Sequence, residues 1–118
     1  MPSTPSLNIG EQIDETFRKF EATSDWRLSL PAKVIIQQGF LSMGRDTLGM
    51  GDYGQSSKRG ELFQVGLANL TAFLLELEAE ASKRPEAEKR SKEIGGVFVL
   101  QNAKRWQKIF QCKCWPVN

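Results

Sequence analysis

The chain has 118 residues and a mass of 13.3 kDa, a length that favours one domain. It contains no histidine, which excludes histidine-dependent catalytic triads and histidine-ligated metal sites. Its 16 Lys and Arg nearly balance its 14 Asp and Glu, and 40% of the residues are hydrophobic, as in ordinary soluble globular domains. No motif in the chain fixes a reaction, so we expect no catalytic residue and no cofactor.

Three segments are predicted to be the main helices of the fold. Ile9, Ile13, Phe17 and Phe20 recur at helical spacing, which predicts a helix over 9–23 after a loose arm at 1–8. A second helix is predicted over 31–43, because a proline at the first helical position costs little. The third and clearest helix is predicted over 61–82.

The 61–82 segment carries a heptad seam and is apolar on nearly every side in its first half. Such a helix is either the central buried helix of its domain or part of an oligomer interface. We expect both roles, and therefore a homodimer or larger assembly. The seam residues are Phe63, Leu67, Leu70, Leu74 and Leu77.

Residues 44–60 contain five of the ten glycines and are predicted to form a loop. A glycine-rich loop before a helix can bind phosphate through its backbone N–H groups. The spacing here matches neither of the two common nucleotide-binding patterns. A plain connector is therefore the favoured interpretation.

The C-terminal third is predicted to contain a small β element. A short exposed helix is expected over 86–93, and Val97 to Leu100 is the best strand candidate. Residues 103–112 fit either a helix or a second strand, and we favour a hairpin because a lone strand would have no partner. The predicted fold is one domain, 1–118, mainly α, with a three-helix core and a small C-terminal β element; an α+β fold is the alternative.

The basic charge is concentrated at the C-terminal end. Residues 1–82 carry 7 basic and 11 acidic side chains, whereas 83–118 carry 9 basic and 3 acidic. Cations with interleaved aromatic residues are typical of nucleic-acid binding, although the tryptophans could equally be core anchors beside a solvated lysine face. Within a basic, aromatic segment at 94–118, the candidate contacts to an acidic partner are Lys104, Arg105, Trp106, Lys108, Lys113 and Trp115.

Helical carboxylates suggest an alternative function. Glu11, Asp14 and Glu15 share one face of the first predicted helix, and Glu76 and Glu80 lie one turn apart on the third. The Glu11-x-x-Asp14 pair resembles the carboxylate motifs of the all-α nucleotide pyrophosphohydrolases, which implies a metal-dependent nucleotide hydrolase. The second motif of that family is missing.

Two further features carry less weight. Cys112 and Cys114 are predicted to be a reduced pair without a metal, because the chain has no further Cys and no His and a four-ligand zinc site would need carboxylates or a second chain. Residues 30–41 resemble a segment in the small helical subunits of type III CRISPR effector complexes. That resemblance covers about a tenth of the chain and does not fit a strand-like C-terminus, so we do not assign the family.

These features together favour a small, non-catalytic adaptor. We expect it to self-associate through helix 61–82 and to contact an acidic partner, possibly nucleic acid, through its C-terminal segment. The start of the chain has no signal-peptide pattern, and the most apolar window, Val65 to Leu75, would span only about half a bilayer as a helix. A cytoplasmic protein without membrane contact is the resulting expectation.

Overall fold

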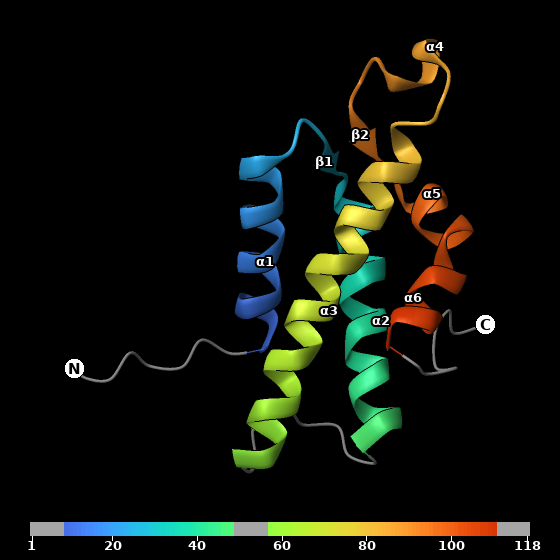
Figure 1. Cartoon of the computed structure of the whole chain (residues 1–118). Coiled ribbons are helices and arrows are strands. Elements are labelled where there is room, and N and C mark those ends of the chain that lie inside the picture. The colour runs from blue at the N-terminus through green and yellow to red at the C-terminus, as the bar shows by residue number, and fades with distance from the viewer. Residues whose placement is uncertain (1–8, 49–56, 111–118) are drawn as a thin grey trace.

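The computed structural model describes residues 9–48 and 57–110, and the side chains of 10–42 and 66–109. This part of the chain is mainly helical, with a small two-stranded parallel sheet (Figure 1). In chain order the elements are α1 (Ile9–Thr23), β1 (Arg27–Leu28), α2 (Leu30–Leu48), α3 (Ser57–Ala81), α4 (Glu86–Lys89), β2 (Glu93–Ile94), α5 (Gly96–Gln101) and α6 (Ala103–Phe110).

The long helix α3 lies at the centre of the described part. It packs against α1, α2 and α6, and Figure 1 shows α1 and α6 on opposite sides of the α2–α3 pair. Apolar side chains at helical spacing bring these elements together, because each helix buries one stripe against its neighbours. One core results, and its largest fully buried side chains include Phe17, Phe40, Phe73, Leu74 and Trp106.

The sheet ties the connection between α1 and α2 to the segment that follows α4. Arg27 pairs with Glu93 and Leu28 with Ile94 in a parallel register. The backbone N–H of Arg27 donates to the carbonyl of Lys92 at 2.8 Å, and both Leu28 and Ile94 are buried. The strands are only two residues long, so their backbone hydrogen bonds alone stabilise the pairing weakly. Burial of Leu28 and Ile94 adds to that stabilisation.

The predicted mainly helical fold is confirmed, including the three long helices. The helices extend beyond the predicted bounds, because α2 continues to Leu48 and α3 begins at Ser57, inside the segment predicted as a loop over 44–60. The remainder of that loop and the arm at 1–8 lie outside the described residues. Within the described ranges, no helix combines the length and apolar character that crossing a membrane requires.

The predicted positions of the β element were wrong. Residues 97–100, expected to be a strand, lie in α5, and 103–112, expected to be a hairpin, form α6 as far as Phe110. Gly95 adopts an extended conformation (φ −92°, ψ 171°) and starts α5, whose Phe98 and Val99 then turn inward together. Helix α5 packs on α2 and α6 packs on α3, and neither segment pairs with a strand. The burial gained in these contacts outweighs the local β propensity.

A third correction concerns the charged stretch after Pro85. The helix expected over 86–93 ends at Lys89, and residues 93 and 94 form β2. The chain leaves the helix through Lys92, which has a φ of 55° in the left-handed region. A small β element therefore exists, but it pairs the C-terminal third with the α1–α2 connection.

Candidate functional site

Helix α6 has one buried face, which fixes its orientation. Ala103 and Trp106 lie three residues apart and are buried, and Ile109 packs against the core from the next turn. The Trp106 ring meets Phe73 of α3 and Phe40 of α2 edge to face, with centroid distances of 4.9 and 6.4 Å. This aromatic contact holds α6 to both long helices.

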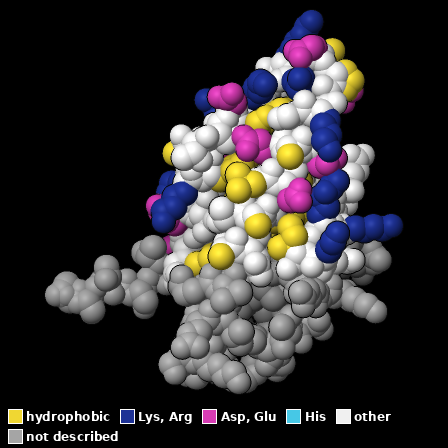
Figure 2. All heavy atoms as spheres, viewed as in Figure 1, with side chains coloured by type: hydrophobic (Ala, Val, Ile, Leu, Met, Phe, Trp, Pro, Cys, Tyr) yellow, Lys and Arg dark blue, Asp and Glu magenta, His cyan; other side chains and the backbone are white. Residues whose placement is uncertain are grey.

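The opposite face of α6 is basic. Lys104 and Lys108 are exposed and lie four residues apart, so their side chains are neighbours on one face of the helix. Neither lysine forms an ion pair with any described residue. Figure 2 shows Lys and Arg side chains gathered along the edge of the molecule where Figure 1 places α6.

Arg105, between these lysines, is tied to the end of α3. Its Nη2 lies 2.8 Å from Glu80 Oε2 and its Nη1 lies 3.7 Å from Glu76 Oε2. Lys83 Nζ reaches the same Glu80 oxygen at 3.0 Å. The hydrogen bond from Lys83, followed by the charge of Arg105, holds the pKa of Glu80 below its ordinary value.

The basic α6 surface is defined here as Lys83, Lys104, Arg105 and Lys108. Its four cations exceed the two carboxylates among them, Glu76 and Glu80, by two charges. Exposed ammonium groups without bound carboxylates attract phosphates, because contact with a polyanion releases its counterions. The net positive charge of this surface would therefore attract the backbone phosphates of a polyanion.

Trp106, a candidate contact from sequence, is fully buried. Its ring takes the core-anchor role that was the alternative interpretation, and both of its described aromatic contacts are internal. No face of this ring is open for stacking on a base. Lys113 and Trp115 lie outside the described residues, as do Cys112 and Cys114.

The predicted oligomer seam lies largely inside the single chain. Leu70, Leu74 and Leu77 are fully buried in the core, and Leu67 packs against it half-buried. The side chain of Phe63 lies outside the described part. Leu70, Leu74 and Leu77 therefore contact their own chain, where α3 packs against α1, α2 and α6.

Three of the helical carboxylates of the alternative function, Glu15, Glu76 and Glu80, form ion pairs within the fold. Glu15 pairs with Arg18 of its own helix, and Glu78 accepts a hydrogen bond from the Ser24 hydroxyl. Glu76 and Glu80 face Arg105 rather than the carboxylates of α1. In the described ranges no three His, Cys, Asp or Glu side chains are grouped in a way that could hold a metal ion. The described geometry therefore favours ion pairing for these groups.

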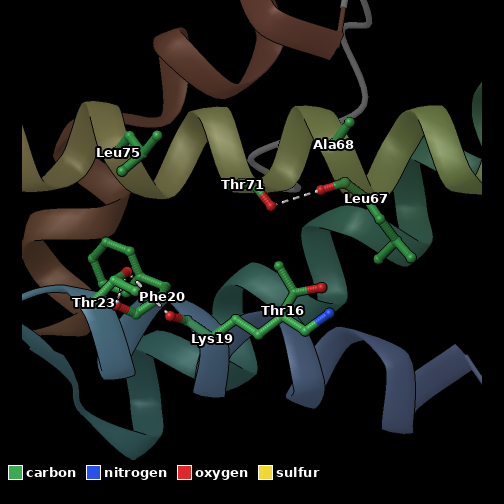
Figure 3. Close-up of a pocket in the computed structure, with 8 residues that line it drawn as sticks. All are labelled: Thr16, Lys19, Phe20, Thr23, Leu67, Ala68, Thr71 and Leu75. Atoms are coloured by element: carbon green, nitrogen blue, oxygen red, sulfur yellow. Dashed lines mark hydrogen bonds between the residues drawn. The ribbon is translucent and has the colours of Figure 1, made fainter.

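A groove of about 490 Å³ runs between α1 and α3 (Figure 3). The hydroxyls of Thr16, Thr23 and Thr71 each donate to a carbonyl one turn earlier in the same helix, at 3.0 to 3.2 Å. The O–H donors of these threonines are therefore used within their own helices, and the ammonium group of Lys19 is the charged group in the lining. The full lining is Thr16, Lys19, Phe20, Thr23, Leu67, Ala68, Thr71 and Leu75.

Sequence reasoning missed two sets of surface residues. Lys83 was placed in a charged connector, and the pairing through Glu80 brings it beside α6. The charge count over 83–118 included it, but only the tertiary contact shows where it lies. No surface role was predicted for Leu30 or Val97, and both are largely exposed. Sequence pattern alone gave no signal for that exposure.

Comparisons with known proteins leave the chain without an assigned family. No family model, no curated protein and no solved structure matches it. The strand-like C-terminus that did not fit the resemblance of residues 30–41 is helical as far as Phe110. The C-terminus therefore no longer argues against that resemblance, but the resemblance covers only about a tenth of the chain and assigns no family.

Proposed function

We propose that this protein is a non-catalytic binding module that holds a polyanionic partner, with nucleic acid the leading candidate, through the basic α6 surface. The observation that carries the proposal is the pair Lys104 and Lys108. Both are exposed, one helical turn apart, and unpaired with carboxylates among the described residues. The ion pairs of Arg105 hold the helix that presents them.

Contacts from this surface would be made to phosphates rather than to bases. Lysine is a point charge that meets a phosphate oxygen without reading sequence, and the one aromatic ring of α6 described here is buried. Binding by the described residues should therefore be independent of sequence and sensitive to salt. Each phosphate contact contributes about 0.7–0.9 to the slope of log K against log salt concentration.

The test is binding of fluorescein-labelled 20-mer duplex and single-stranded DNA, followed by fluorescence anisotropy from about 20 to 150 mM NaCl. The variant is Lys104→Gln/Lys108→Gln, and we expect it to reduce the salt slope by about 1.5 because two phosphate contacts are lost. Circular dichroism should show an unchanged fold, since both lysines are exposed.

The matched control is Arg18→Gln/Lys19→Gln on α1. It removes two positive charges at exposed side chains. Helix α1 lies on the side of the α2–α3 pair opposite α6 (Figure 1). We expect the control to keep the wild-type slope. Absence of wild-type binding at about 20 mM salt would overturn the proposal. An equal loss in both variants would also overturn it, because net charge rather than this surface would then explain binding.

A further inference from the structure

Exposed large hydrophobic side chains are concentrated on α2 and α5. Four of the five in the described part of the chain lie on these two helices. Leu30 and Val97 are exposed by 74% and 72%, and Val34 and Leu100 by about half. Such a concentration differs from the scattered single apolar residues that any surface carries.

Helices α2 and α5 pack directly against each other. Gly96 at the start of α5 lies so close to α2 that a Cβ there would be 2.9 Å from Ile35 Cδ1 and 3.4 Å from Pro31 Cβ. Leu30 and Val34 adjoin those two α2 residues in sequence, and Val97 follows Gly96. We define the α2–α5 patch as Leu30, Pro31, Val34, Val97 and Leu100.

None of the five patch residues is charged, and the Arg84 guanidinium near α5 lies over the Phe98 ring, 3.8 Å from its centre. None of the residues of α5 is charged, and the described side chains of α2, from 30 to 42, include one charged group, Lys33. That lysine is half-buried and pairs with Glu21 of α1 at 3.5 Å. Among the described side chains of these helices, Gln38 and Gln101 are the other exposed ones. A quarter of the whole chain is charged, so a neutral surface of this extent is a specific feature.

We propose that the α2–α5 patch is the surface through which a second copy of this chain docks, forming a two-fold dimer. Two neutral apolar patches can meet without like-charge repulsion or unpaired charges. The proposal moves self-association from the buried α3 seam to an available surface, and it stands independently of polyanion binding.

The area of the patch agrees with a modest dimer. A patch of these side chains is on the order of several hundred Å², the size at which exposed apolar surface on a monomer is often functional. Two such patches with their glutamine rims come near the lower limit of about 1,200 Å² for a standard interface. We therefore expect a dimer that dissociates on dilution.

The experiment measures molar mass by sedimentation equilibrium over about 1–200 μM. The wild type should approach twice 13.3 kDa at the upper end. Leu30→Glu/Val97→Glu should remain at 13.3 kDa throughout, because each interface would bury unpaired carboxylates. Both positions are exposed in the monomer, so its circular dichroism spectrum should be unchanged.

The control is Leu75→Glu, which introduces a carboxylate at the fifth exposed hydrophobic residue, on α3. It should dimerise as the wild type does. A second pair of variants keeps the test valid if the double variant folds poorly. Val97→Glu and Val97→Lys should each be monomeric alone. When mixed, they should form a dimer, because the opposite charges can then pair across the interface. A wild type that stays monomeric at about 200 μM overturns the proposal. The proposal is also overturned if Leu75→Glu disrupts the dimer while Leu30→Glu/Val97→Glu leaves it intact.

Discussion

Trp106 illustrates how a single residue supports two interpretations until its surroundings are known. In sequence it lies among lysines, as a base-stacking aromatic residue would, and it also lies three residues after Ala103 at helical spacing. The structure buries it between Phe40 and Phe73. Composition could locate the basic segment. It could not show that Trp106 packs α6 against the core while Lys104 and Lys108 face solvent.

Lys92 is the one non-glycine residue with a positive φ in the described part of the chain. Its φ of 55° redirects the chain into β2, and its carbonyl accepts the hydrogen bond from Arg27 N–H. The ammonium group lies 5.1 Å from the centre of the Trp26 ring. A residue with a Cβ is destabilised by about 1–2 kcal/mol at a positive φ. The hydrogen bonds of the Lys92 N–H to the Lys89 carbonyl and of the Lys92 carbonyl to Arg27 N–H hold the residue in this conformation.

The first prediction at this scale compares Lys92→Gly with Lys92→Ala. Both substitutions remove the ammonium group from Trp26, but glycine accepts a positive φ without strain. The glycine variant should be more stable by about 1 kcal/mol in urea unfolding. The neighbouring Ser91, which has no positive φ, should show the opposite order for the same two substitutions. Equal stability of the two Lys92 variants would contradict the assignment of strain.

At the scale of elements, the long helices were predictable and the short ones were not. The periodicity of Ile13, Phe17 and Phe20 identified α1, and the apolar 61–82 segment identified α3, because repeated burial leaves a strong signal over several turns. Helix α5 has six residues, too few to show a period. Its Val97 to Leu100 run favours a strand locally, and only its contact with α2 overrides that preference.

The ion pairs between α3 and α6 predict a specific pH dependence. Because the pKa of Glu80 is lowered in the folded protein, its ionised form stabilises the fold above the unfolded pKa near 4.5. That stabilisation is lost as the pH falls from there through the folded pKa. Glu80→Gln should therefore be less stable than the wild type at pH 7, with the difference shrinking below about pH 4.5 in thermal unfolding.

The control for this dependence is Glu88→Gln on α4. Glu88 is exposed and is described without an ion pair, so its loss should leave the pH dependence of unfolding unchanged. If Glu80→Gln ran parallel to the wild type from pH 7 to pH 3, the contacts of Glu80 with Lys83 and Arg105 would not contribute to stability.

For the whole molecule, what could be predicted was fold class and charge distribution. Sequence pattern identified a mainly helical chain with a basic C-terminal end, and it named Lys104 and Lys108 as candidate contacts. It could not show that Leu70, Leu74 and Leu77 of α3 are buried within their own chain, because a helix apolar on all sides has the same pattern in a monomer core and in an interface. The neutral α2–α5 patch likewise depends on which apolar residues are left uncovered.

The last prediction tests whether the described elements unfold as one unit. Trp106 lies where α2, α3 and α6 meet, and Trp26 is buried beside β1, in a different part of the same core. Trp106→Ala should lower the free energy of unfolding by about 3–5 kcal/mol, and Trp106→Phe by less, because a smaller ring keeps part of the contact. In a Trp115→Phe background, Trp106→Ala leaves Trp26 as the only tryptophan. Its fluorescence and the far-ultraviolet circular dichroism should then shift to the same lower denaturant midpoint, as one cooperative core requires. A Trp26 transition that kept its wild-type midpoint while helical signal was lost earlier would show that α6 and its contacts unfold separately.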